Sequence, residues 1–350
     1  MNPTVSAIKG LAIIAMVLGH SHSSYHTTIV TFVNQFHMPI FFFIAGYCFK
    51  ERYIQSPFLF LKKRITKLWW PYVKFGLIFL FFHNILFYCH LYSSDFGFRE
   101  HTSTLYTSTQ FIFFAKETLL FNHTEELLGG YWFLKVLFWA SIFSFLWIYC
   151  FNRIKHFLVL GALFFLSLSI LNNYFKFSYP YLPISSQIFT AAFIFLCGQV
   201  FAYYKIRTFK TFISFGLLIL PFIGSLYWEL YMATEFYDNS KFIPYLISAI
   251  IVTWSLFSLL SNIGQIKFLI FAGNNSLTIL TWHFLSFKVI SLLIVLIYNL
   301  PFTQISEFPV ILEYSTSGWW IAYFVFAIAS TLAIAYLKSY LEYPHFANTN

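Results

Sequence analysis

The sequence predicts an all-α fold, a polytopic membrane helix bundle with about ten transmembrane helices and with both the N-terminus and the C-terminus in the cytoplasm. Three observations predict it. Of the 350 residues, 59% are hydrophobic and only 9% are charged, whereas about a quarter of the residues of a soluble domain are charged. The apolar residues form ten stretches, each near the roughly 20 residues that cross a bilayer. The basic residues gather in alternate connections between those stretches.

The ten apolar stretches follow one another without a Gly/Ser-rich or Pro-rich linker. We therefore expect one transmembrane domain over residues 1–350. The first stretch lacks a cleavage-site pattern, so it predicts a retained helix and not a signal peptide that is removed. The predicted spans lie near residues 5–24, 28–49, 69–91, 131–151, 157–174, 185–204, 211–230, 243–261, 275–299 and 318–340.

The distribution of charge sets the predicted orientation. Alternation from a cytoplasmic N-terminus places thirteen of the 21 Lys and Arg residues in inner connections and four in outer ones. Among the acidic residues, only Glu51 and Glu342 fall inside. This asymmetry follows the positive-inside rule, so both the count of spans and the orientation are predicted together.

The same distribution argues against several classes of function. The net charge of +9 is explained by membrane topology, so we expect no nucleic-acid partner. The four cysteines form no Cys-x-x-Cys pair, which predicts neither a disulfide framework nor a zinc site. His20, His22 and His26 are close in sequence, but no His-Glu-x-x-His pattern accompanies them, so we expect no metal.

Two connections carry structure of their own. The external connection 92–130 contains the apolar run from Phe111 to Phe121, which is too short to span and predicts an interfacial or re-entrant helix. The inner connection 50–68 has an apolar patch at 58–61 followed by Lys62, Lys63 and Arg64. This pattern predicts a helix at the cytoplasmic headgroups.

Ionisable side chains within a bilayer are costly and therefore predict function. Lys9 and His20 lie eleven residues apart in the first span, which places them on one helix face and about 16 Å apart along the axis. The alternative is that Lys9 extends to the inner headgroups while His20 forms hydrogen bonds at the outer interface.

The second and third spans begin with further candidates. His37 stands two residues before Pro39, a combination that favours a kinked helix with polar groups turned toward a cavity. Arg64 and Lys67 are three residues apart and predict one cationic helix face suited to phosphate groups. The alternatives are an interfacial histidine and an ordinary positive-inside anchor.

Two later spans add polar groups. The fourth opens with the run from Gly129 to Trp132, and the ninth contains His283 near mid-membrane and Lys288. An unpaired imidazole is costly there, so we expect His283 to face the bundle interior. Glu125 and Glu126 precede the fourth span, and we expect them to be solvated.

Together these features resemble the membrane-bound acyltransferase-3 family, in particular the branch similar to fucose 4-O-acetylases. The resemblance covers the whole chain, because the ten spans and the motifs occur in the family's order. Lys67 departs from the family's Arg-x-x-Arg element, since lysine keeps the charge but lacks the planar fork of arginine. The matching positions are Lys9 to His20, the run from Phe36 to Tyr47, Arg64 with Lys67 and then Pro71-Tyr72, Trp132 to Leu134, and His283.

The resemblance implies an acyltransferase that transfers groups other than amino-acyl groups, here an O-acetyltransferase of the cell inner (cytoplasmic) membrane. It implies acetyl-CoA as the donor and a hydroxyl of a surface polysaccharide or lipid-linked sugar as the acceptor. His20 is expected to act as general base, or alternatively to carry the acyl group transiently. The remaining expected roles are donor stabilisation by Lys9, acceptor or proton-relay roles for His37 and His283, donor binding by Arg64 and Lys67, and substrate contact by Trp132.

Two rival functions fit the same architecture. A polysaccharide or lipid-linked-sugar exporter is also a many-helix bundle with intramembrane charge, although the sequence shows no duplicated half. A lipid-linked-sugar polymerase is less favoured, because the 92–130 connection is mostly uncharged. Dependence on acyl-CoA distinguishes the enzyme from the exporter.

Overall fold

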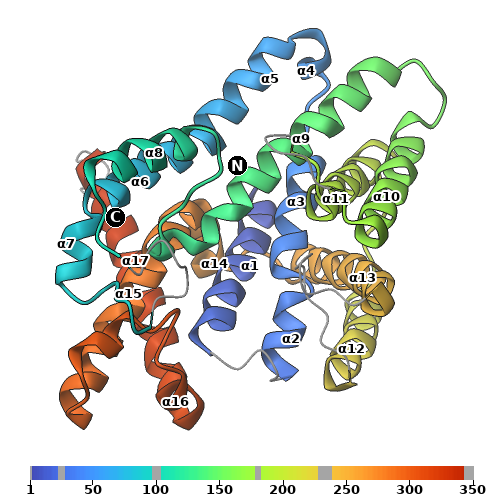
Figure 1. The fold of residues 1–350 in the computed structure, drawn as a ribbon. Helices are drawn as coiled ribbons and strands as arrows, with labels where there is room; N and C mark the ends of the chain where they lie inside the picture. The colour runs from blue at the N-terminus through green and yellow to red at the C-terminus, as the bar shows by residue number, and fades with distance from the viewer. Residues whose placement is uncertain (1, 23–27, 97–103, 178–182, 228–238, 343–350) are drawn as a thin grey trace. The chain divides into compact units, whose positions relative to one another are not determined.

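The computed structural model describes residues 2–22, 28–96, 104–177, 183–227 and 239–342 (Figure 1). Helices form throughout these ranges, and no strand occurs within them. The prediction of an all-α fold is therefore confirmed.

Eight of the ten predicted spans correspond to helices, or runs of joined helices, that are long and apolar enough to cross a membrane, counted within the described ranges. The chain is thus a multi-pass membrane protein, while the side on which its termini lie stays a prediction. The helices are α1 (Pro3–Ser21), α2 (Thr28–Asn34) with α3 (His37–Tyr47), η3 (Glu126–Tyr131) with α9 (Trp132–Phe151), α10 (Phe157–Phe175), α11 (Ser186–Tyr203), α13 (Asn239–Ile263), α15 (Ser276–Tyr298), and α16 (Leu312–Tyr314) with η5 (Ser315–Trp319) and α17 (Trp320–Glu342).

The other two predicted spans differ. The stretch at 211–230 forms α12 (Thr211–Tyr227), whose 17 residues end at the limit of the described range. The stretch at 69–91 is divided into α6 (Trp70–Phe81) and α7 (His83–Tyr88) by a break at Phe82. Just after this break, the Asn84 amide exchanges two hydrogen bonds with the backbone of Tyr106, at 3.0 and 2.8 Å.

Both connections that were expected to hold short helices do so. The connection 50–68 contains α4 (Arg52–Gln55), α5 (Pro57–Arg64) and the π-helix η1 (Ile65–Trp69). The other contains α8 (Ser108–Leu119), which begins with a capping box between Thr107 and Gln110. Two further short elements are α14 (Lys267–Asn274) and η4 (Phe302–Ser306).

The chain divides into two compact units, each of which is described by itself. The first unit comprises Met1–Ala12, His26–Pro71 and Phe133–Ile270, and the second comprises Ile13–Tyr25, Tyr72–Trp132 and Phe271–Asn350. The single domain over residues 1–350 stays a prediction. In the second unit, α15 packs against α17, η3 and η4.

Glycines permit a close helix contact in the first unit, between α3 and α11. A Cβ on Gly46 would lie 1.8 Å from the carbonyl oxygen of Phe195, and one on Gly198 would lie 1.9 Å from that of Phe43. Small residues commonly allow such close approach between membrane helices.

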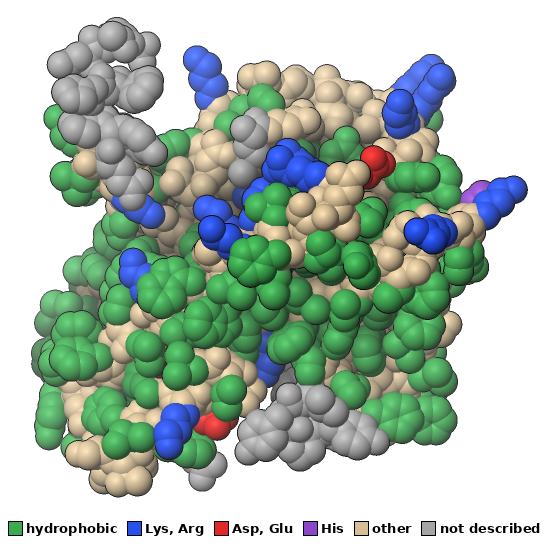
Figure 2. Space-filling model, turned by 90° about the horizontal axis from the view of Figure 1, so that it is seen from above, with side chains coloured by type: hydrophobic (Ala, Val, Ile, Leu, Met, Phe, Trp, Pro, Cys, Tyr) green, Lys and Arg blue, Asp and Glu red, His purple; other side chains and the backbone are tan. Residues whose placement is uncertain are grey.

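Apolar side chains form much of the surface. Figure 2 shows a face where hydrophobic side chains predominate over the few acidic ones. Exposed examples include Phe212 and Leu220 of α12, at 87% and 67% exposure. Exposed apolar surface on this scale suits contact with lipid.

Candidate active site

His283 lies on α15 with its side chain fully buried in the second unit. Its Nδ1 is 3.1 Å from the carbonyl oxygen of Ile279 and 3.0 Å from that of Leu280. Carbonyl oxygens only accept hydrogen bonds, so Nδ1 carries a proton. Nε2 is buried and has no hydrogen-bond partner among the described residues. Because an unpaired buried charge is costly, we assign the neutral ring, whose Nε2 lone pair can accept a proton.

His20 lies beside this imidazole. The two ring centroids are 5.6 Å apart, with an angle of 29° between the ring planes. Phe284 contacts both rings, at centroid distances of 5.1 Å from His20 and 3.9 Å from His283. The structure therefore brings together two predicted site residues from distant parts of the sequence.

The C-terminal end of α1, which carries His20, is fixed by the segment that leads into α17. The Ser315 hydroxyl donates to the carbonyl oxygen of Ser21 at 3.1 Å. The ring of His22 lies 5.9 Å from that of Trp320. These contacts hold the end of the helix within the second unit.

The Gly129-Gly130 pair brings η3 close to His283. A Cβ on Gly130 would lie 2.9 Å from Leu280 Cδ1 and 3.8 Å from His283 Cε1. The next residue, Tyr131, shares a 2.7 Å hydrogen bond with the hydroxyl of Thr281. Trp132 begins α9 and is half-buried, and its contact with substrate stays a prediction.

Lys288 connects α15 to the segment after it. Its side chain is 2% exposed, and its ammonium donates to the carbonyl oxygens of Ser306 and Glu307 at 3.1 and 2.7 Å. The ammonium also lies 5.6 Å from the ring centroid of Phe308, which packs 4.7 Å from the ring of Phe284. Sequence reasoning assigned Lys288 no role, although an ionisable residue within a span was the available signal.

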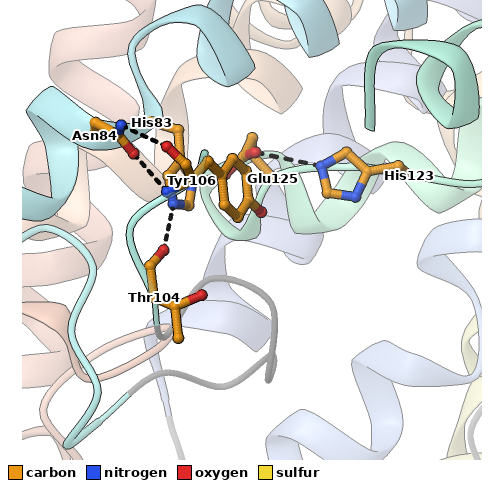
Figure 3. A network of polar contacts seen from close by, with 6 residues as sticks. All are labelled: His83, Asn84, Thr104, Tyr106, His123 and Glu125. Atoms are coloured by element: carbon orange, nitrogen blue, oxygen red, sulfur yellow. Dashed lines mark hydrogen bonds and ion pairs between the residues drawn. The ribbon is translucent and has the colours of Figure 1, made fainter. Parts of the chain in front are cut away.

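Glu125 and Glu126 are buried at 0% and 1% exposure, so the expectation that they are solvated was wrong. Glu125 is instead paired with two imidazoles, His83 Nδ1 at 2.9 Å and His123 Nε2 at 3.2 Å (Figure 3). Burial raises the pKa of Glu125, but hydrogen bonds and charge from His123 and His83 outweigh burial and lower that pKa to about 2. Glu125 is therefore ionised at neutral pH.

The other candidates belong to the first unit. Lys9 is half-buried on α1 and lies near the Cys48 side chain. His37 is 8% exposed, and its Nδ1 donates to the carbonyl oxygen of Val33 at 2.9 Å. Its ring is thereby held in one orientation at the start of α3.

Arg64 and Lys67 differ in environment. The guanidinium of Arg64 lies 4.7 Å from the ring centroid of Phe60, whereas Lys67 is exposed. The expected cationic face assumed an α-helix, but a π-helical turn follows Arg64 and changes the angle between the two side chains. Burial lowers the pKa of Arg64 to about 10, which leaves the guanidinium charged at neutral pH.

Comparison with known proteins gives one family. No curated protein and no solved structure matches the chain. Residues 2–340, nearly the whole chain, match the family described as an acyltransferase domain. With its membrane-spanning helices, the chain belongs to the acyltransferase-3 family and is a membrane acyltransferase.

Proposed function

We propose that this membrane acyltransferase is an O-acyltransferase, specifically an O-acetyltransferase similar to fucose 4-O-acetylases. It transfers acetyl from cytoplasmic acetyl-CoA to a hydroxyl of a cell-surface or lipid-linked carbohydrate, in the inner membrane. The observation that carries the proposal is the His20–His283 pair, in which a buried imidazole keeps an unpartnered acceptor nitrogen.

A sugar hydroxyl is a weak nucleophile, so its proton must be removed as it attacks. A positioned histidine typically contributes about 10²–10⁴-fold to such a step. His20 takes the hydroxyl proton, and the hydroxyl oxygen forms a bond to the thioester carbonyl carbon. The carbon–sulfur bond then breaks, and the CoA thiolate leaves and recovers the proton. His283 supports His20 as a proton relay, and the alternative of a transient acyl group on His20 remains open.

The donor is assigned to the cationic segment that precedes α6. CoA carries several phosphates, and arginine suits them through its planar fork. Arg64 Nε is buried without a hydrogen-bond partner among the described residues, which supports a role in binding an anion. Lys67 adds charge, and Lys9 stabilises phosphate or thioester charge. His37 and Trp132 contribute to acceptor binding.

The test is transfer of radiolabelled acetyl from acetyl-CoA into cell-envelope glycans. Wild type is compared with His20→Ala, with a null strain and with His90→Asn. His90 is an exposed histidine in the left-handed backbone region, which asparagine tolerates, so it serves as the control. Label that requires the protein and His20, but not His90, supports the proposal.

Equal labelling in all strains contradicts the O-acetyltransferase. Glycan transport into vesicles that lack acyl-CoA would instead favour the exporter. Either result leaves membership of the family unchanged and removes only the assigned donor, acceptor and base.

A further inference from the structure

Glu125 is the centre of a buried polar cluster outside the histidine pair. The cluster joins His83 of α7, His123 and Glu125 before η3, and the backbone of the 104–106 segment (Figure 3). His83 Nδ1 lies 2.9 Å from Glu125 Oε2, and His83 Nε2 lies 3.0 Å from the carbonyl oxygen of Thr104. His123 Nε2 lies 3.2 Å from Glu125 Oε1.

The hydrogen-bond partners determine the charge of this cluster. A carboxylate and a carbonyl both accept only, so both ring nitrogens of His83 must donate, and His83 is an imidazolium. Glu125 and His83 therefore form an ion pair in which each side chain is 0% exposed. The ring of Tyr106 lies parallel to the His83 ring at 3.4 Å and 4°, which favours the cation further.

The cluster is also tied to the surrounding backbone. The Tyr72 hydroxyl donates to the carbonyl oxygen of His123 at 2.9 Å, and the ring of Phe114 stacks on the His123 ring at 4.4 Å. Glu125 is thus held from α6, α7 and α8 within the second unit. Because its surroundings are held from several elements, the Glu125 carboxylate also fixes the position of the Glu125 backbone.

That backbone leads directly to the histidine pair. Glu125 is the N-cap residue of η3, and its carbonyl oxygen accepts a 2.9 Å hydrogen bond from Leu128 N. One turn later Gly130 lies against Leu280 and His283. The adjacent Glu126 is buried too, and it lies near Lys288. The start of η3 is therefore fixed by charge and its end forms a wall of the candidate active site.

We infer that Glu125, paired with His83 and His123, is a positioning residue for acyl transfer that holds η3 against His283. It touches no reacting atom and acts through the Gly129–Tyr131 segment. The inference rests on the proposed function, since it assumes that His20 and His283 carry out the transfer. A misplacement of about 1 Å at a catalytic group can cost on the order of 10²-fold in rate.

The experiment measures hydrogen exchange and activity in the same full-length proteins. Glu125→Gln keeps the size of the side chain and removes its charge, His83→Gln removes the partner, and the double variant removes both. Asp95→Asn is the matched control, because Asp95 is an exposed carboxylate between His83 and Glu125 in the sequence. Amide exchange over residues 126–131 reports on η3. The value of kcat is divided by the amount of folded protein, which is measured by size-exclusion chromatography in detergent.

The following results together support the inference. Glu125→Gln increases exchange at 126–131, lowers kcat between about 10-fold and 100-fold, and leaves KM for acyl-CoA within about twofold, because none of the predicted donor residues belongs to the cluster. The double variant is no slower than Glu125→Gln, since residues that act as a pair are not additive. Glu125→Asp recovers part of the rate, and Asp95→Asn matches wild type.

Unchanged amide exchange in Glu125→Gln would show that Glu125 does not hold η3 in place. Faster exchange with unchanged kcat overturns its role in transfer, as does a loss of rate that only follows the loss of folded protein. If wild type itself transfers no acyl group, the proposed function fails while the exchange measurement still decides whether Glu125 holds η3 in place.

Discussion

The α3–α11 contact gives a prediction whose size follows from distances. In Gly46→Ala, the new Cβ would lie 1.8 Å from the carbonyl oxygen of Phe195 and 2.7 Å from its carbonyl carbon. Ordinary contact begins at 3.4 Å, so the helices must separate locally by 3.4 − 1.8, or about 1.6 Å. Both opposing atoms are backbone, so no side-chain rotation relieves the clash.

Two energies oppose each other in this variant. Overpacking of a closely packed contact costs about 1–3 kcal/mol, occasionally more. Alanine in a helix recovers up to about 1 kcal/mol relative to glycine. We expect a net loss of about 1–2 kcal/mol of unfolding free energy, with a lower melting midpoint.

Gly216→Ala isolates the packing contribution. Gly216 lies in α12, and a Cβ there meets no atom within 4 Å. This variant should therefore gain up to about 1 kcal/mol from helix propensity alone. The difference between the two variants then measures the cost of the clash.

The assay is the apparent melting midpoint of detergent-purified protein, followed by fluorescence-detected size exclusion. We expect Gly46→Ala to melt below wild type and Gly216→Ala to melt at or above it. Equal midpoints for the two variants would refute the reasoning, because they would show that α3 and α11 do not approach closely at Gly46.

Three further predictions concern the site and its charges. His283→Asn keeps a donor for the carbonyl oxygens of Ile279 and Leu280 but removes the Nε2 lone pair, so kcat should fall about 10²–10⁴-fold in folded protein. A single-turnover rate of transfer within about threefold of wild type would contradict this prediction. The pKa of Glu125 is lowered from 4.5 to about 2 on folding, so its stabilisation, about 3 kcal/mol, is present above pH 4.5 and is lost as pH falls toward 2. The melting midpoint of Glu125→Gln should consequently vary less than that of wild type over this range, and parallel curves would disprove the assignment. Lys67→Arg introduces a planar fork and should lower KM for acyl-CoA about two- to fivefold. The exposed control Lys155→Arg should leave KM unchanged. An equal change of KM in both variants would contradict a specific role for the fork at position 67.

Much of the fold was predictable because lipid imposes a simple requirement on length and composition. Eight predicted spans correspond to helices of sufficient length in the described part of the chain. The stretch at 69–91 was predicted as one span but is divided at Phe82, which hydropathy alone does not register. The π-turn after Arg64 was not predicted either, because the spacing of Arg64 and Lys67 was interpreted as α-helical.

The candidate site was predictable only in part. His20 and His283 were recognised as costly intramembrane groups, but their contact depends on packing between α1 and α15 within the second unit. Glu125 was expected in water, because an acidic residue beside a span usually marks the interface. Its burial depends on His83, which is 42 residues away and lies in the stretch that was predicted as a continuous span.

The buried polar groups of the second unit are of two kinds, those with hydrogen-bond partners, to which we assign a structural role, and one without, to which we assign a role in transfer. Glu125 has two imidazole partners, and Lys288 donates to two carbonyl oxygens, so both charged groups have hydrogen-bond partners. His283 is equally buried and uses Nδ1 fully, yet its Nε2 has no partner among the described residues. A buried polar atom left unpaired costs about 1–3 kcal/mol, and a proton relayed from His20 would satisfy it. The same chemistry that makes Nε2 costly in the free protein makes it able to accept a proton during transfer.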